Sequence, residues 1–331
     1  RVRCWIALTV STELGVLRNC CIVWRCTCQG YKVKIKIIMS KLRILVRCLW
    51  GYILKYCFDL SLLNIPSLGD KNQANVIVSL TSYGRRVEKC VVYYTICSLL
   101  RQNIQPKRII LWLAENEWSD EKLPVRLLRL KSKGLEIMYY KDIRSYKKLI
   151  PTLKFYPNQD IITVDDDMMY SADTVQALVE EHKRYPKDII CLNASEPIIE
   201  NGCPSHYEKW ESYKDYKSGN LVFPIGVGGI YYPHGSLHSD VMREDLFIQL
   251  CPLADDIWFW FNGLRAGTIK RFILKSKKNY SFDDLYQYFH RGSALTHTNC
   301  QGHQNNSQFA SIFEHYKVFI SEHKTLAHRN K

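Results

Sequence analysis

The chain has 331 residues, of which 47% are hydrophobic and 12% aromatic, enough for one large α/β domain or two smaller ones. Its formal net charge is +14, but residues 1–63 hold 11 basic and 2 acidic residues, whereas the remaining 268 hold 35 and 30. Because the body is only mildly basic, this composition argues against a nucleic-acid-binding domain and favours a basic N-terminal segment beside anionic lipid.

The first 38 residues hold 5 of the 13 cysteines and give no clear structural signal. No small-residue cleavage site follows a clean apolar stretch, so we expect no cleavable signal peptide, reduced thiols and a cytosolic protein. These cysteines include no Cys-x-x-Cys pair, which disfavours a zinc site. Because the first methionine is Met39, we expect residues 1–38 to be a leader that is disordered or not native.

Residues 39–63 predict an amphipathic helix. In 42–63 the polar positions recur every four residues in an apolar and aromatic stretch, which would give a helix one narrow polar stripe. Four charges are costly in a membrane span, so we expect this helix to lie on an anionic membrane surface, at the inner face of the cell membrane. The alternative is a helix buried against the body of the protein. Residues 64–73 indicate a linker.

Between residues 74 and 192 short apolar strands alternate with helices, which predicts repeated βαβ units. Strands are expected at 75–80, 108–113, 135–140, 161–164 and 188–192, and helices at 88–102, 120–132, 145–155 and 171–185. The fold class is therefore α/β, a Rossmann-like, mainly parallel sheet flanked by helices. In such sheets ligands bind beyond the carboxyl ends of the strands, where Thr81–Arg86, Glu115 and Asp165–Asp167 are expected.

Three consecutive carboxylates, Asp165, Asp166 and Asp167, follow the apolar strand at 161–164. They repel one another, and a hard divalent cation such as Mg²⁺ or Mn²⁺ would relieve that repulsion. In an extended segment side chains at i and i+2 point the same way, so Asp165 and Asp167 are expected to share one ion. The alternative is a solvated acidic turn ahead of the next helix.

The second half of the chain is less regular. Residues 193–220 predict a long polar loop, and 308–321 predict a closing amphipathic helix before a tail at 321–331. Between them, Gly226-Val227-Gly228-Gly229 precedes a strand and would let the backbone approach a ligand, or simply bend there. Asp255 and Asp256 open an apolar helix, either as ordinary first-turn carboxylates or as carboxylates at the wall of a cleft.

Several motifs in this order resemble a known family, the nucleotide-sugar-dependent glycosyltransferases of the GT-A class, and more closely the bacterial enzymes of capsular and surface polysaccharide synthesis. The motifs are VSLTSYGRR, SLLRQNIQPKRIILWLAE, SYKKLIPTLKFYP, VDDDMMY, GVGGIYYP and ADDIWFW. The resemblance covers roughly residues 74–320 and implies a nucleotide-sugar half at 74–192 and an acceptor half at 193–320. It also implies Mn²⁺ or Mg²⁺, a UDP- or GDP-sugar donor, and a glycan or lipid-linked glycan acceptor.

The resemblance assigns roles on the donor side. Asp165 and Asp167 of the DxD motif would hold the metal against the diphosphate, with Asp165 toward the ribose. Lys147 or Lys148 would lie near the diphosphate, the sequence leaving the choice open. The nucleotide pocket would be lined by Thr81, Tyr83, Arg85, Glu115, Gly228 and Gly229.

On the acceptor side the resemblance makes Asp256 the general base, with Asp255 as the alternate. A third metal ligand would be His290, His297 or His303, and the stereochemistry of transfer stays open. Two rival functions remain. A metal-dependent sugar nucleotidyltransferase would share the carboxylates and the sheet, and residues 82–86 would be its triphosphate loop. A non-catalytic, membrane-associated binding protein would leave both carboxylate clusters unused.

Overall fold

The computed structural model describes residues 65–274, 280–281, 304–321 and 326–328, together with the helical positions 46, 49, 53 and 56. The chain divides into a smaller unit, Arg1–Cys57 with Asp283–Tyr288, and a larger unit, Phe58–Phe282 with Phe289–Lys331. All residues of the candidate site lie in the larger unit.

In the smaller unit, four apolar positions are helical and exposed: Val46, Leu49, Ile53 and Tyr56. Their spacing places them on one side of a helix, as the amphipathic pattern of 39–63 predicts. Contact with a membrane surface stays a prediction. Among the residues that the structure describes, no helix has both the length and the apolar content needed to cross a membrane.

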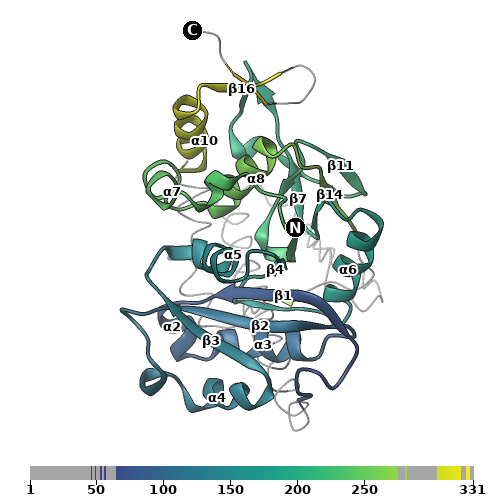
Figure 1. The fold of residues 1–331 in the computed structure, drawn as a ribbon, viewed down its shortest axis with the longest axis vertical. Helices are drawn as coiled ribbons and strands as arrows, with labels where there is room; N and C mark the ends of the chain where they lie inside the picture. Colours follow the sequence, from purple (N-terminus) through teal and green to yellow (C-terminus); the bar gives the residue numbers. More distant parts are fainter. Residues whose placement is uncertain are drawn as a thin grey trace, which may run out of the picture. The chain divides into compact units, whose positions relative to one another are not determined.

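An eight-stranded, mainly parallel sheet forms the centre of the larger unit, which confirms the predicted α/β class (Figure 1). Across the sheet the strands are β11 (Lys217–Gly219), β14 (Lys270–Phe272), β6 (Ile189–Cys191), β13 (Ile230–Tyr232), β4 (Asp160–Thr163), β1 (Gln73–Thr81), β2 (Gln105–Ala114) and β3 (Leu135–Tyr140). The strands β4, β1, β2 and β3 pair in parallel. β13 runs antiparallel between β4 and β6 because the chain reaches it without a helical crossover.

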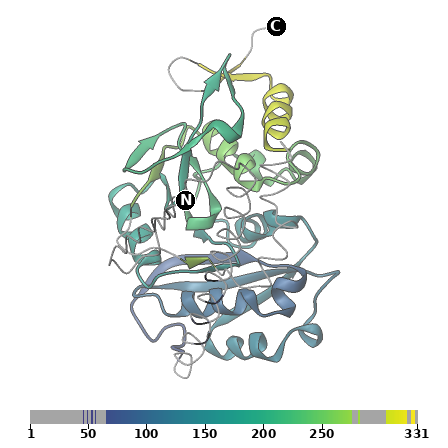
Figure 2. The same ribbon diagram turned by 180° about the vertical axis from the view of Figure 1, so that it is seen from behind.

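Helices α3 (Val91–Leu100) and α5 (Ile150–Phe155) cover opposite faces of β1 and β2 (Figures 1 and 2). The predicted helix 88–102 corresponds to α3, and a separate short helix, α2 (Gly84–Glu88), precedes it because Cys90 between them takes a left-handed conformation with φ 55°. The segment 120–132, predicted as one continuous helix, is not continuous. It is one short helix, α4 (Val125–Leu128), between two 3₁₀ turns, and it ends as expected at Gly134, with φ 98°.

The polar region 193–220 is not a plain loop, which corrects the prediction. It holds β7 (Ala194–Glu196), β8 (Ile199–Glu200), β9 (Cys203–Pro204), β10 (Glu211–Ser212) and β11. β7 pairs with β10 and with β12 (Phe223–Pro224) in a small antiparallel sheet. Strands of two or three residues are too short for the alternating pattern by which a strand is recognised in sequence.

The remaining helices pack in the second half of the unit: α6 (Thr174–Arg184), α7 (Glu244–Leu250), α8 (Asp255–Arg265) and α10 (Gln304–His315). In α8 four consecutive aromatic side chains, residues 258–261, are buried, which anchors the helix that begins at Asp255. The helix predicted at 308–321 lies earlier than expected and ends at His315. The chain then forms β16 (Val318–Ile320), which pairs with β17 (Leu326–His328).

Candidate active site

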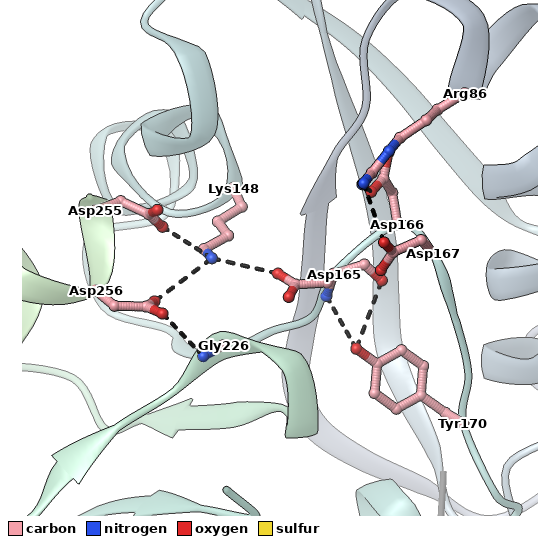
Figure 3. Close-up of polar contacts among 9 residues, drawn as sticks. All are labelled: Arg86, Lys148, Asp165, Asp166, Asp167, Tyr170, Gly226, Asp255 and Asp256. Atoms are coloured by element: carbon pink, nitrogen blue, oxygen red, sulfur yellow. Dashed lines mark hydrogen bonds and ion pairs between the residues drawn. The ribbon is translucent and has the colours of Figure 1, made fainter. Parts of the chain in front are cut away.

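The three aspartates leave β4 in a turn and not in an extended segment. β4 ends at Thr163, and Asp166 and Asp167 form the turn. The expectation that Asp165 and Asp167 point the same way is therefore wrong. Oδ1 of Asp165 lies 3.4 Å from Nζ of Lys148, whereas Oδ2 of Asp167 lies 3.0 Å from Nη2 of Arg86 (Figure 3). The two carboxylates thus pair with different cations.

The middle carboxylate, Asp166, anchors this turn. Ser82 Oγ donates a hydrogen bond to its Oδ2 at 2.5 Å. Arg86 forms an ion pair with its Oδ1 (Figure 3). Its backbone carbonyl accepts a hydrogen bond of 2.8 Å from the hydroxyl of Thr95 in α3. The sequence placed Asp166, Ser82 and Arg86 in the polar clusters expected at this edge of the sheet, but it did not predict the contacts among them. The spacing of Ser82 and Arg86 could have indicated their shared role, because residues four apart at the start of a helix lie on the same side of it.

Tyr170 holds the other end of the same loop. Its hydroxyl accepts a hydrogen bond of 2.9 Å from the backbone N–H of Asp165. The Tyr170 N–H in turn donates to Oγ of Ser98 in α3 at 3.0 Å. The buried helix α3 therefore supports the loop through the side chains of Thr95 and Ser98, which are three residues apart on one face.

Lys148 brings a second pair of carboxylates to the first. Its Nζ lies 2.8 Å from Asp255 Oδ2 and 3.6 Å from Asp256 Oδ1, in addition to its contact with Asp165 (Figure 3). Only 7% of the Lys148 side chain is exposed. Lys147, the alternative that the sequence left open, forms an ion pair with Asp142 instead. The structure therefore selects Lys148 as the basic residue beside the aspartates.

Burial and crowding shift the protonation of these groups. Burial raises the pKa of Asp256 to about 7; Lys148 opposes the shift, and Asp255 and Asp165 add to it. Burial likewise raises the pKa of Asp167 to about 7, against the effect of Arg86. Burial alone would lower the pKa of Lys148, but the carboxylates around it outweigh burial and hold the pKa well above its usual value.

The charge balance and the donor atoms fit a divalent cation. Five carboxylates, residues 165–167, 255 and 256, gather around the two cations Arg86 and Lys148. Carboxylate oxygens are the hard ligands that Mg²⁺ and Mn²⁺ prefer. Additional positive charge would oppose the burial and, after it, the repulsion from Asp166 and Asp165 that raise the pKa of Asp167. In the described part of the chain no three His, Cys, Asp or Glu side chains are already grouped as a metal site.

Of the three glycines in the Gly-rich loop, Gly226 faces the site. Its N–H donates to Asp256 Oδ2 at 3.1 Å (Figure 3), and a Cβ there would lie 2.8 Å from Lys148 Nζ. Gly228 instead packs on the backbone at Leu192–Asn193, and Gly229 bends the chain with φ 100°. Approach of this loop's backbone to a ligand stays a prediction, and the glycine beside the carboxylates is Gly226 and not Gly228 or Gly229.

The residues expected at the nucleotide pocket have varied surroundings. The Thr81 hydroxyl donates to the carbonyl of Trp112 at 2.9 Å, and Arg85 is exposed. Tyr83 is 45% exposed, with the Arg86 guanidinium 5.4 Å from its ring centroid. Glu115 is exposed too.

Near this pocket it is Glu117 that holds the loop after β1, accepting the Gly84 N–H at 2.9 Å. Sequence reasoning had named only Glu115. The three histidines considered as a further metal ligand, His290, His297 and His303, lie outside the described residues.

Comparison with known proteins does not identify the chain. No family model and no curated protein matches it. Among solved structures, UTP-bound UGPase from Acinetobacter baumannii aligns over 71% of this chain and 98% of its own, with 8% identity and a TM-score of 0.41. S. aureus TarS 1-349 aligns over 74% and 72%, with 14% identity and a TM-score of 0.41. A CMP:2-keto-3-deoxy-manno-octonic acid synthetase aligns over 67% and 98%, with 11% identity and a TM-score of 0.41. Likeness at this level carries no functional argument.

Proposed function

We propose that this protein is a metal-dependent glycosyltransferase that moves a sugar from a nucleoside-diphosphate sugar to a hydroxyl of a glycan or lipid-linked glycan. The observation that carries the proposal is the meeting of Asp165, at the end of β4, with Asp255 and Asp256, at the start of α8, on the single ammonium of Lys148. The aspartates that follow β4 would serve the leaving diphosphate, and the pair at the start of α8 would serve the attacking hydroxyl.

On the donor side, Asp165 and Asp167 would hold Mn²⁺ or Mg²⁺ once their side chains turn from Lys148 and Arg86 toward one ion, and the bound ion would offset the negative charge of the leaving diphosphate. The ammonium of Lys148 would add fixed positive charge at the same place. Arg86 keeps Asp166 and Asp167 in position through its two ion pairs. A preorganised charge of this kind costs no rearrangement when the sugar–phosphate bond breaks.

On the acceptor side, Asp256 is the group that would take the proton. The acceptor oxygen forms a bond to the anomeric carbon, its proton passes to Asp256, and the electrons of the broken carbon–oxygen bond leave with the diphosphate. The N–H of Gly226 orients the Asp256 carboxylate, and Asp255 remains paired with Lys148. A pKa of about 7 matches a base that works near neutral pH.

The nucleotide would bind beyond the ends of β1 and β2. The exposed ring of Tyr83 offers a stacking surface for a base, and its neighbour Arg85 is exposed beside it. Glu115 would accept a hydrogen bond from the base. The donor would be a UDP- or GDP-sugar, and the products would be a nucleoside diphosphate and an extended glycan.

The N-terminal segment would hold the enzyme at an anionic membrane surface, on the cytosolic face. The exposed apolar positions Val46, Leu49, Ile53 and Tyr56 support this, as does the excess of basic residues in 1–63. Sedimentation with vesicles tests it: the full chain should bind vesicles that contain phosphatidylserine and not pure phosphatidylcholine. Equal recovery with both would contradict the electrostatic part of the proposal.

The activity is tested by a screen of UDP- and GDP-sugars for hydrolysis that depends on Mn²⁺ or Mg²⁺, which requires no acceptor. We expect one donor to be hydrolysed, and calorimetry to show tighter binding of UDP or GDP with Mn²⁺. Asp167→Asn should abolish hydrolysis, whereas the exposed control Asp215→Asn should not. Pyrophosphate release from a nucleoside triphosphate and a sugar 1-phosphate would instead establish a nucleotidyltransferase and overturn the proposal.

A further inference from the structure

A cavity of about 460 Å³ lies outside the carboxylate site, in the part of the larger unit that follows β6. Its walls come from β7, from the β8–β9 hairpin, from β11 with the residues on either side, and from the end of β16. The polar side chains in the wall are Glu196, Tyr213, Lys217, Ser218, Asn220 and Ser321. The apolar ones are Pro197, Ile199, Leu221, Val222 and Ile320. Pockets of this size and mixed character bind small organic ligands.

The composition of this cavity suits a neutral, polyhydroxylated ligand. Glu196 and Lys217 carry opposite charges, so the wall favours neither an anion nor a cation. A carboxylate accepts hydrogen bonds from hydroxyl groups, whereas the ammonium and amide groups of Lys217 and Asn220 donate them. The apolar residues can pack against C–H groups. A sugar ring presents both kinds of surface.

The cavity is connected to the carboxylate site by short lengths of chain. Val222, in the cavity wall, is four residues before Gly226, whose N–H binds Asp256. Four extended residues span at most about 14 Å. A second link runs through Asn193, which is three residues before Glu196 in the chain. The carbonyl of Asn193 accepts a hydrogen bond from the Ile225 N–H at 2.9 Å. A glycan chain of a few residues is long enough to occupy both places.

A buried lysine stabilises one wall of the cavity. Lys270 in β14 is fully buried, and its Nζ donates to the carbonyl of Asn220 at 3.0 Å. Gly263 in α8 leaves room for it, because a Cβ there would lie 3.1 Å from Lys270 Cε. Burying an amine without a carboxylate partner is costly, and burial lowers its pKa to about 7. The hydrogen bond to Asn220 offsets part of the cost of burying the amine.

We propose that this cavity is a saccharide-binding subsite that holds a neutral part of the acceptor glycan, away from the hydroxyl that reacts. Its acceptor role rests on the glycosyl transfer proposed above, but saccharide binding itself does not. Gly219, in the wall, allows a direct test. A Cβ there meets no atom within 4 Å, and its φ lies outside the left-handed region, so the backbone accepts a larger side chain, which we expect to take up space at the cavity wall.

The experiment measures binding of maltotriose, lactose and triacetylchitotriose to the full chain by saturation-transfer NMR and calorimetry, without nucleotide. We expect at least one of these neutral saccharides to bind at millimolar concentration, Gly219→Ala to bind it nearly as well, and Gly219→Phe to lose at least tenfold in affinity. Lys217→Met should weaken binding too, whereas Lys214→Met, an exposed lysine outside the wall, should not.

Two results would overturn the subsite: no binding of any of the three saccharides to the unmodified chain, or unchanged affinity in Gly219→Phe. Binding of UDP or GDP with Mn²⁺, measured on the same samples, should be equal in all variants. Saccharide binding without nucleotide binding would leave the subsite standing and refute the glycosyltransferase proposal. Nucleotide binding without saccharide binding would refute the subsite and leave the glycosyltransferase proposal standing.

Discussion

Lys148 and Asp255 form a buried ion pair, Nζ to Oδ2 2.8 Å, between the segment before α5 and the first residue of α8. Because Asp165 and Asp256 also lie within 4 Å of the same ammonium, this contact joins the end of β4 to the second half of the chain. The four groups therefore respond together to substitution.

Replacing Lys148 by Met should destabilise the protein by about 3–5 kcal/mol, because it leaves buried carboxylates without their cation. Urea unfolding measures this. The exposed Lys154→Met in α5 is the matched control and should change stability by less than about 1 kcal/mol. If Asp255→Asn restores part of the stability of Lys148→Met, the pair is coupled as the structure shows; strictly additive losses would contradict this.

Asp166→Ala should be as damaging to activity as Asp165→Ala, although Asp166 is the middle residue of a DxD motif. The substitution leaves Ser82 Oγ and the Arg86 guanidinium without their shared acceptor, at a cost of about 1–3 kcal/mol. Thermal unfolding and donor hydrolysis together check this. Full activity in Asp166→Ala would show that the anchoring contacts do not position the loop.

Gly226→Ala should abolish turnover with little loss of stability. The added methyl group would lie 2.8 Å from Lys148 Nζ and 3.3 Å from both Asp165 Oδ1 and Asp256 Oδ1, so the cluster must separate. Steady-state kinetics measures the loss, and the exposed Lys183→Ala in α6, outside both the carboxylate site and the cavity wall, is the control. An active Gly226→Ala would mean that the cluster tolerates displacement.

Asp160, at the start of β4, predicts a pH dependence of stability. Burial alone would raise its pKa, but hydrogen bonds from His182, Tyr231 and the N–H of His234 outweigh burial and lower the pKa to about 2 from the usual 3.8. A lowered carboxyl pKa stabilises the folded state above pH 3.8, and the contribution disappears as the pH falls through about 2.

The matching substitution is Asp160→Asn. Since the side chain is 23% exposed, we expect a loss of only about 1–2 kcal/mol at pH 7. Urea unfolding at a series of pH values should show the difference between the two proteins shrinking between pH 4 and pH 2. A difference that stays constant over that range would contradict the lowered pKa.

Local pattern in the sequence determined the alternation of strands and helices, including β3 at residues 135–140, the stop at Gly134 and the strand that runs into the three aspartates. These follow from side-chain periodicity and from glycine's access to positive φ, both of which act over a few residues. The α/β class followed from the same local signals.

Tertiary structure alone decided which neighbour of each polar pair faces the site: Lys148 and not Lys147, Arg86 rather than the exposed Arg85. In the 3₁₀ turn Arg144–Lys148 successive side chains point about 120° apart, so two adjacent lysines face different surroundings. The rotation of that turn is set by long-range packing such as Tyr146 stacked on Phe247, with ring centroids 4.0 Å apart. No short window of sequence contains that contact.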